Sequence, residues 1–542
     1  MASLHAYKRG IGYWGLMFSA ISAMIGSGWL FSALYVGRIA GPSSIIAWIF
    51  GGFLVMLVAL TYAEISTMLP ITGGSTRFPQ LTHGTFVSLF FGWITWFNLM
   101  TAPAIEVQAM LQYAANYWPC LLKVSQGQVS VHGLSAYGYT IATGMMVSFS
   151  LINVYSIRFI SRINNIFSFW KLIIPILTAT VLLLVSFHPH NFNNVAYGGF
   201  FPHGLKGVFI ALATGGILFA FNGFKQAAEM AGEATNPKRA LPIAIVGSVG
   251  ITLIIFLLLE FAFLYSLTPG NLSHGWHHIA LQDNNSPLTS IAVQDHLKDL
   301  LPLLYIGAII SPLAAGLMYC GSASRSLYAM SKNGYIPSFF KHLSAEGNPM
   351  YAIGLNFIVG MCMFAPLPGW QSMMAFLTSL MAITYAIAPI CLLALRRQVP
   401  DFERPFRLPF ATLWCTLAFY VCTLLVYWSG WDIIFKTDIG IIIGFVVLFL
   451  YQTFGKNPRK VKLDWQAGIW IWPYFIGLSV VSYFGNYGGG VGIFNDWQAA
   501  VLLAILAVIC LYIATRFALP AKRVTLTLSK LNLKRYDLME GG

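Results

Sequence analysis

Two glycine-containing motifs interrupt long apolar segments of this chain. Gly26-Ser27-Gly28 lies within the first apolar segment, and Phe221-Asn222-Gly223 lies within a later one. A bilayer offers no hydrogen-bond partners, so a helix can unwind at membrane depth only where the freed N–H and C=O groups line a cavity or meet a ligand. The amides that follow the first motif, at the positive end of a half-helix, could receive a carboxylate. The motifs therefore predict a binding site for a small molecule.

An alternative exists for the first motif, because Gly-Ser-Gly can also simply allow two helices to pack closely. The second motif favours the binding site. It occupies the same place in a second set of five apolar segments as the first motif does in the first set. A pair of interrupted spans in corresponding places is expected of the inverted repeats of transporters.

Three ionisable residues within apolar segments are further candidates, since charge at membrane depth is costly and often functional. Lys171 could lose and regain a proton during a transport cycle, or could extend toward the membrane surface. Glu106 could pair with Lys171 or Lys225, relay a proton, or be a carboxylate held by neighbouring hydroxyls. Lys225 follows the second motif and could attract an acidic ligand side chain; alternatively it pairs with Glu229 one helical turn on.

The composition places these residues in a membrane protein. Hydrophobic residues make up 57% of the chain and charged residues 9%, and the mean hydropathy is +0.71, far from the range of soluble domains. Apolar runs of spanning length predict an all-α protein with about 14 spans. They lie near residues 11–37, 44–69, 85–117, 133–155, 164–187, 206–232, 239–267, 301–330, 350–367, 371–395, 409–431, 438–454, 465–485 and 496–517. The runs at 350–367 and 438–454 are short and could fail to cross fully.

The basic residues indicate the orientation of these spans. Most of the 31 lysines and arginines fall in the loops of one side. The other side or its border holds only Arg38, Lys123, Lys206, Lys298 and Lys436. By the positive-inside rule, both ends of the chain are expected in the cytoplasm.

Several classes of function are disfavoured. The net charge of +14 does not indicate nucleic-acid binding, because the basic residues lie in short loops between apolar runs. The seven cysteines form no CxxC motif and are expected to pack without disulfides or metal. The histidines of the loop near 268–300 are interpreted as ordinary loop residues. No HExxH or GxSxG motif indicates an enzyme, and neither a cofactor nor a metal is expected.

Five sequence segments in order resemble the amino acid/polyamine/organocation superfamily of permeases, over about residues 8–410. They are GSGWLF at 26–31, YAEISTMLPITGGSTRFP at 62–79, FAFNGFKQAAEMAGEATNPKRALPIAI at 219–245, SASRSLYAMSKNGYIPSFF at 322–340 and LRRQVPDFERPFRLP at 395–409. Among its branches, the chain looks most similar to the bacterial aspartate–proton symporters.

This resemblance implies a five-plus-five inverted repeat in which spans 1 and 6 are broken. Residues 1–400 would form the transporter core, with repeats at roughly 11–187 and 206–395. Residues 401–518 would add further spans without an assigned role, and 519–542 would form a basic cytoplasmic tail. The implied location is the bacterial inner membrane, and the partners are an amino acid, protons and lipid; the oligomeric state is left open.

The resemblance also implies roles for individual residues. Ser27 and Gly28 would hold the α-carboxylate of an amino acid, and carbonyls near Ile25 and from Phe219 to Phe221 would hold its amino group. The predicted substrate-binding residues are Ile25, Gly26, Ser27, Gly28, Phe219, Ala220, Phe221, Asn222 and Lys225. Lys171 matches a lysine that replaces a sodium ion in several relatives, which favours proton coupling, with Glu106 as its candidate partner. Many relatives have an acidic residue where Lys225 stands, so the reversed sign favours an acidic substrate.

The predicted function is therefore proton-coupled import of aspartate or glutamate by alternating access. Trp29 and Tyr319 are expected to close over the substrate as gates. Glu64, Arg77, Glu233 and Arg239 are expected to be structural or to latch the cytoplasmic loops. An amino acid exchanger, a neutral amino acid permease, a channel and a non-transporting nutrient sensor remain as alternatives.

Overall fold

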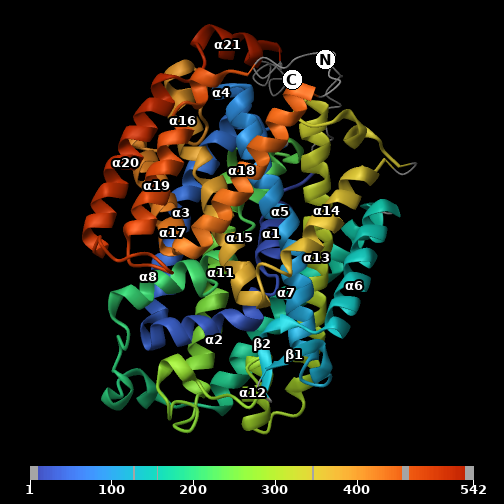
Figure 1. Cartoon of the computed structure of the whole chain (residues 1–542), viewed down its shortest axis with the longest axis vertical. Helices are drawn as coiled ribbons and strands as arrows, with labels where there is room; N and C mark the ends of the chain where they lie inside the picture. Colours follow the sequence, from blue (N-terminus) through green and yellow to red (C-terminus); the bar gives the residue numbers. More distant parts are fainter. Residues whose placement is uncertain are drawn as a thin grey trace.

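The computed structural model describes residues 10–71, 73–125, 128–155, 157–344, 347–454 and 463–530. This part of the chain is almost wholly helical, and many helices run along the long axis of the molecule (Figure 1). Ten of the described helices are long and apolar enough to cross a membrane, and two shorter apolar helices accompany them. The chain is thus a multi-pass membrane protein with the all-helical architecture that its composition predicts.

The first group of helices begins with an interrupted span. Its members are α1 (Tyr13–Met24), α2 (Gly28–Ala40), α3 (Ser44–Met68), α4 (Gly74–Thr82), α5 (Thr85–Ala114), α6 (Ala136–Tyr155) and α7 (Ile157–Val185). Between α5 and α6 stands an antiparallel hairpin of β1 (Leu122–Ser125) and β2 (Gln128–Leu134). The all-α prediction omitted this hairpin, since strands this short between two apolar runs carry little periodic signal.

The second group also begins with an interrupted span. Its members are α8 (Gly204–Thr214), α9 (Ile217–Ala220), α10 (Lys225–Glu229), α11 (Pro237–Ser266), α12 (Pro287–Gln294), α13 (Leu300–Lys332), α14 (Met350–Met363), α15 (Gly369–Tyr385) and α16 (Ile387–Gln398). The helix at the predicted short run 350–367 has 14 residues and stays below full spanning length.

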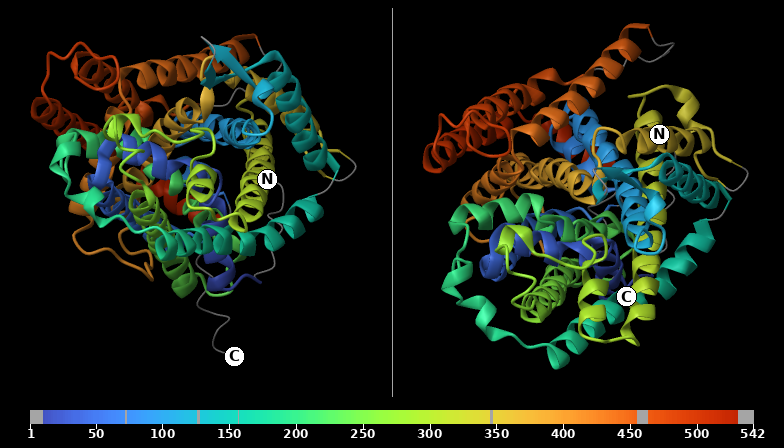
Figure 2. Two further views of the ribbon diagram at one scale, coloured as in Figure 1. Left: turned by 90° about the horizontal axis from the view of Figure 1, so that it is seen from below. Right: turned by 60° about the horizontal axis from the view of Figure 1, so that its bottom comes forward.

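The remaining helices pack against one side of these two groups. They are α17 (Ala411–Trp428), α18 (Trp431–Phe454), α19 (Ile471–Phe484), α20 (Asp496–Arg516) and α21 (Ala521–Lys530). Figure 2 shows them as an orange and red wall, and α17 contacts α3, α15 and α16. The predicted run at 438–454 was too short. Asp432, Lys436 and Asp438 interrupt the apolar pattern at the start of α18, so the sequence did not show where this helix begins. The helix has 24 residues, which is enough to span a membrane.

The tail after α20 is not wholly irregular, since α21 buries Val524 and Leu528 against the helices beneath it. It rests on α4 and α16, and residues 531–542 of the predicted tail lie outside the described residues. We call the face with α4, α21 and the end of α16 the basic face, and the face with β1, β2 and α12 the opposite face. Figure 1 shows them at the top and the bottom.

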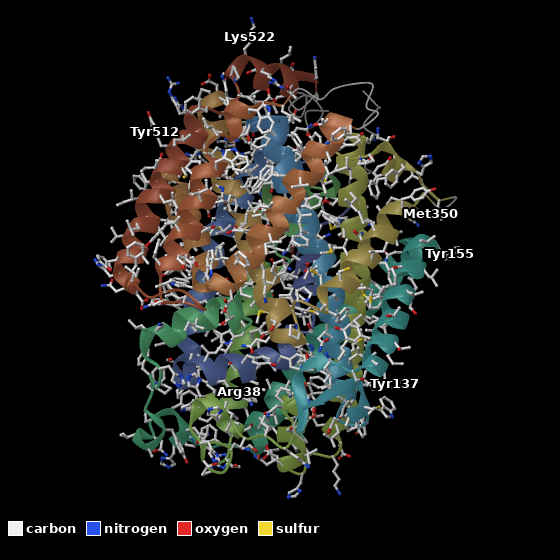
Figure 3. The ribbon with its side chains drawn as sticks, in the orientation of Figure 1. Arg38, Tyr137, Tyr155, Met350, Tyr512 and Lys522 are labelled. Carbon is white, nitrogen blue, oxygen red and sulfur yellow. The ribbon has the colours of Figure 1, made fainter. Side chains whose placement is uncertain are left out.

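The outer wall between these faces carries exposed apolar side chains. Tyr155 on α6 and Tyr512 on α20 stand outward (Figure 3), with exposed fractions of 68% and 67%. Such a wall is expected where lipid replaces water as the solvent.

The two interrupted spans lie side by side inside the bundle. α1 packs against α10 near the basic face, while α2 packs against α8 and α9 toward the opposite face. Their interruptions therefore meet in the interior, where the structure positions the candidate site.

Candidate functional site

The first interruption separates α1 from α2, in agreement with the sequence. α1 ends at Met24 and α2 begins at Gly28, which leaves Ile25, Gly26 and Ser27 between them. The Ser27 N–H donates to the Glu106 carboxylate of α5, with 2.9 Å between N and Oε2. A Cβ at position 26 would clash with the other oxygen of this carboxylate, so glycine is needed for Glu106 to reach the interruption.

The second interrupted span is broken twice. The predicted break at Phe221-Asn222-Gly223 lies in the turn between α9 and α10. A further break separates α8 from α9 at Gly215 and Gly216, where Gly216 has a left-handed φ of 109°. The isolated helix α9 has only four residues, Ile217–Ala220, and belongs to the site rather than to a span.

The interruptions of the two spans touch through their backbones. A Cβ at Gly223 would lie 2.8 Å from the Met24 nitrogen and from the Ala23 carbonyl carbon. The Tyr319 hydroxyl of α13 lies 3.1 Å from Ala23 O and 2.8 Å from Asn222 O, so it bridges both. The predicted gating residue Tyr319 therefore holds the two interruptions together in this conformation.

Lys171 and Glu106 are both buried next to the first interruption. The Lys171 ammonium of α7 donates to Ser22 O of α1 at 2.9 Å, and its side chain has no exposed surface. Its charge acts on the Glu106 carboxylate, although no ion pair within 4.0 Å joins the two groups among the described residues. Of the two predicted partners of Glu106, the structure thus favours Lys171.

Lys225 is a buried cation with few contacts. Lys225 is the first residue of α10, and its ammonium has no hydrogen-bond partner among the described residues and lies 5.7 Å from the centre of the Tyr385 ring. The predicted alternative was a pair with Glu229. The Glu229 charge does act on this ammonium, but no hydrogen bond or ion pair within 4.0 Å between the two is found in the described part of the chain.

An aromatic cluster covers the interruptions on the side of the opposite face. The Trp370 indole N–H of α15 donates to Ser27 Oγ at 2.8 Å. The Trp370 ring stacks on Phe31 at 5.0 Å and meets Phe219 edge to face at 5.6 Å between ring centres. Sequence reasoning missed Trp370, because one of 16 tryptophans gives no signal of its own.

Trp29, the other predicted gate, points toward α13. Its ring packs at Gly307 of α13, where a Cβ would lie 2.9 Å from Trp29 Cζ2, and its indole nitrogen has no partner. Trp29 thus packs between α2 and α13, and the tryptophan that contacts Ser27 is Trp370, which was not predicted as a gate.

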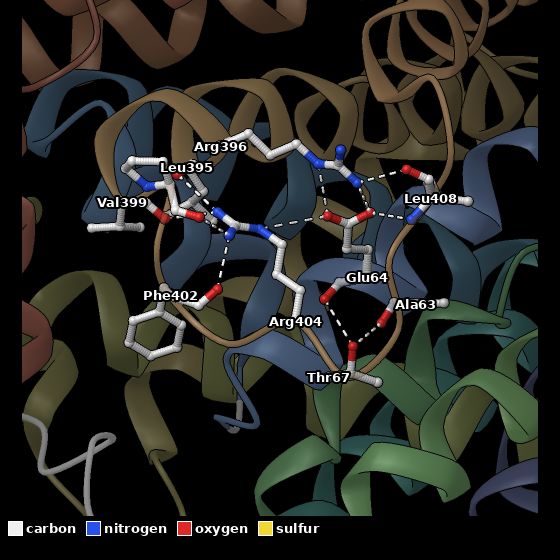
Figure 4. Close-up of polar contacts among 10 residues, drawn as sticks. Ala63, Glu64, Thr67, Leu395, Arg396, Val399, Phe402, Arg404 and Leu408 are labelled. Atoms are coloured by element: carbon white, nitrogen blue, oxygen red, sulfur yellow. Dashed lines mark hydrogen bonds and ion pairs between the residues drawn. The ribbon is translucent and has the colours of Figure 1, made fainter.

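A buried carboxylate paired with two arginines is found at Glu64 on the basic face, as Figure 4 shows. The Glu64 carboxylate of α3 accepts from Arg396 Nε at 2.8 Å and from Arg396 Nη2 at 2.6 Å. The Arg404 guanidinium lies 3.7 Å away, and the Leu408 N–H donates to Glu64 at 2.8 Å. Glu64, predicted to be structural or part of a latch, is therefore tied to the last turn of α16 and to the segment between α16 and α17, and the arginines there were not identified as its partners.

The predicted substrate-binding residues are all buried, so this conformation is closed. Even Phe219, Asn222 and Lys225 have exposed fractions of only 6%, 4% and 7%. A groove of about 410 Å³ runs along α6 and Leu313 of α13, and none of the predicted residues lines it.

Comparison with known proteins now identifies the family. Residues 11–447 match the family model described as amino acid permease. The chain belongs to the amino acid permease family. This family is one of transporters, so the protein is an amino acid transporter rather than an enzyme, as the resemblance in the sequence implies.

Individual relatives cover nearly the whole chain. The chain is 34% identical to the glutamate/serine transporter AimA of Bacillus subtilis, over 94% of this chain and 93% of the relative. It is 32% identical to the aspartate-proton symporter of the same organism, over 95% of this chain and 97% of the relative. The gamma-aminobutyric acid permease of that organism is 25% identical over 82% of this chain and 92% of its own.

Proposed function

We propose that this permease imports an acidic amino acid together with protons, by alternating access across the cell membrane with both chain ends in the cytoplasm. Aspartate and glutamate are the candidate substrates. The α-groups of the substrate bind at the two interruptions, its side chain meets Lys225, and Lys171 with Glu106 carries the coupling.

Lys225 is the observation on which the substrate class depends. A buried ammonium without a hydrogen-bond partner is unfavourable, and the side-chain carboxylate of an acidic amino acid supplies an acceptor of opposite charge. Lys225 directly follows the turn that contains Asn222 and Gly223, so it is beside the predicted site for the amino group. A basic substrate would be repelled there.

Glu106 links substrate binding to the first interruption. Its carboxylate now accepts from the Ser27 N–H, one of the amides proposed to hold the α-carboxylate of the substrate. Two carboxylates cannot share this donor without repulsion. A substrate that takes the Ser27 amide therefore displaces Glu106, and the displaced carboxylate is stabilised by a proton or by a closer approach to Lys171.

Lys171 links protonation to the position of α1. As an ammonium, it makes a charge-assisted hydrogen bond to Ser22 O, two residues before the end of α1. When Lys171 loses its proton, this contact between α7 and α1 weakens. The movement of α1 is thus coupled to proton release.

The names of two relatives support the same function. One relative is a glutamate/serine transporter and the other an aspartate-proton symporter. An acidic amino acid appears in both names and protons in one.

Uptake of radiolabelled aspartate into proteoliposomes with an inward proton gradient tests the proposal. Lys225→Met keeps the length of the side chain but removes the charge, and we expect the KM for aspartate to rise roughly 30-fold. Lys238→Met is the matched control, because Lys238 is exposed and pairs with Glu403 at the basic face. Unlabelled serine is added as a competitor in every assay. An equal loss of apparent affinity for aspartate and for serine would show that Lys225 has no role in selecting charge.

A permease or exchanger of neutral amino acids is the second candidate, since serine also appears in the name of one relative. For that function the charge of Lys225 is balanced by Glu229 alone. Serine uptake that is unaffected by excess aspartate and by the pH gradient would favour it. A nutrient sensor would show neither uptake nor counterflow with any amino acid.

A further inference from the structure

Glu260 is a third buried carboxyl group that the mechanism above does not use. It lies near the end of α11 and has no exposed surface. Glu260 Oε2 accepts from the Trp48 indole N–H of α3 at 3.1 Å, while Oε1 is buried without a hydrogen-bond partner. The Ser44 hydroxyl lies beside this carboxyl group and also lacks a partner within hydrogen-bond distance.

No cation among the described side chains forms a hydrogen bond or an ion pair with Glu260. The helices packed on α11 include α1, α2, α3, α7 and α10, and α12 and short turns complete its surroundings. The described charged side chains on these elements are Arg38, Glu64, Lys171, Lys225, Glu229, Glu233 and His190. None of the hydrogen bonds and ion pairs found for the described residues joins one of them to Glu260, and the only other titratable groups there are tyrosines such as Tyr35 and Tyr62.

An isolated carboxylate is too costly in such a place, whereas a neutral carboxylic acid is tolerated. A proton on Oε1 would let this oxygen donate to Ser44 while Oε2 continues to accept from Trp48. The arrangement therefore fits the protonated acid better than the anion.

Glu260 is also connected to the substrate site and close to the opposite face. α11 ends at Ser266, about one to two turns after Glu260, and leads into the loop before α12 at the opposite face. The Trp48 ring stacks on Phe256 at 4.9 Å and meets Phe221 edge to face at 6.2 Å. Phe221 is part of the second interruption, so a movement there changes the surroundings of Glu260.

We propose that Glu260 binds a second transported proton, separate from the one handled by Lys171 and Glu106, and this inference rests on the proposed import of acidic amino acids. The acid is protonated in the closed conformation and releases its proton to water when the substrate site opens toward the basic face. Transport of aspartate then carries two protons and moves one net positive charge inward.

The stoichiometry of coupling tests this inference. Proteoliposomes hold labelled aspartate on both sides, and the ratio of inner to outer aspartate at zero net flux is measured at several membrane potentials and pH gradients. We expect two protons per aspartate for the native chain and one for Glu260→Gln, whose uptake becomes insensitive to membrane potential. Glu403→Gln is the matched control, because it makes the same change at an exposed carboxylate, and it should keep two protons.

Other outcomes separate the two proposals. Counterflow of labelled aspartate needs no net proton movement, so its absence from the native chain would contradict the proposed function itself. Counterflow with one proton per aspartate in the native chain, or with two protons in Glu260→Gln, would overturn the role of Glu260 alone.

Trp48→Phe gives a second test should Glu260→Gln not fold. This change keeps the acid and removes the donor that stabilises its anion. We expect two protons still, with the midpoint of the pH dependence of uptake shifted to higher pH. An unshifted profile would indicate that Glu260 does not titrate during transport.

Discussion

Glu64 and Glu106 are both buried carboxylates, but their surroundings differ. Glu64 receives two donors from Arg396 and one from the Leu408 backbone, and Arg404 adds a second guanidinium. Glu106 receives the Ser27 N–H, and Lys171, whose charge acts on it, donates to a carbonyl of α1 instead. The Glu64 carboxylate therefore has a full set of hydrogen-bond and charge partners, and the Glu106 carboxylate does not.

The difference separates structural charge from functional charge. A carboxylate with a full set of partners fixes the elements that supply them, and exchange of any partner is unfavourable. A carboxylate that shares one amide with an incoming substrate can exchange its partner at little cost. The Glu64 cluster is thus expected to set stability, and the Glu106 group to set transport.

The largest effect is expected from Lys171→Met. Without the ammonium, protonation no longer changes the contact between α7 and α1, so the proton handled by Lys171 and Glu106 is uncoupled and accumulation of aspartate should fall to what the Glu260 proton alone can drive. Counterflow should remain, because it needs substrate binding without net proton movement. Accumulation and counterflow are measured on the same proteoliposomes.

Lys238→Met serves as the control for this change, since it removes an exposed lysine that pairs with Glu403. Accumulation at the native level in Lys171→Met would show that Lys171 carries none of the coupling, and it would contradict the functional role assigned to Glu106 and Lys171.

Glu64→Gln should act on stability instead. Loss of the charge leaves two guanidiniums without their carboxylate, which costs about 3–5 kcal/mol for a buried pair. We expect a lower apparent Tm of the purified protein and near-native uptake per folded molecule. Glu403→Gln removes an exposed carboxylate from its pair with Lys238 and should change stability by about 0–1 kcal/mol. Equal Tm values for the two variants would contradict the comparison.

The sequence predicts the parts of this comparison that depend on local pattern. Glycines within apolar runs indicate the interruptions. An ionisable residue within an apolar run is recognised as a candidate functional residue, as for Glu106 and Lys171. Contacts between residues that are distant in the chain cannot be predicted from local pattern. Glu64 and Arg396 are separated by 332 positions, and only the packing of α16 against α3 brings them together.

Trp370 illustrates the same limit within the site. Its bond to Ser27 spans 343 positions and depends on how α15 lies across the start of α2. Trp29 was predicted as a gate as one of the aromatic residues near the motifs. Its ring direction is set by α2, and it faces Gly307 of α13 instead.

A smaller effect is expected from Trp370→Phe. The ring contacts with Phe31 and Phe219 can remain, and the hydrogen bond to Ser27 Oγ is lost. A bond of this kind contributes about 1 kcal/mol, so kcat/KM for aspartate should fall roughly fivefold. Trp470→Phe is the control, since the Trp470 indole nitrogen is buried without a partner. An equal loss in both variants would indicate a general effect of ring size.

The smallest effect is expected at the opposite face, where His203 joins the loop after α11 to the start of α8. The His203 ring stacks on His277 with 4.0 Å between ring centres, and its Nδ1 lies 2.9 Å from Ile39 O. Burial, and then the charge of His277, lower the pKa of His203 below its usual value. The folded protein thus resists protonation that the unfolded chain accepts, so acidification through the usual histidine range destabilises the fold.

His203→Asn removes this titration without adding charge. Between pH 7.5 and 5.5 we expect the Tm of the variant to fall by about 1–2 °C less than that of the native protein. His190→Asn is the matched control, because it removes a histidine from a neighbouring turn of the same face. Since His203 is partly exposed, solvent screening keeps the expected difference small. A native Tm that is the same at both pH values would show that this histidine pair, unlike the Glu64 cluster, leaves stability unchanged.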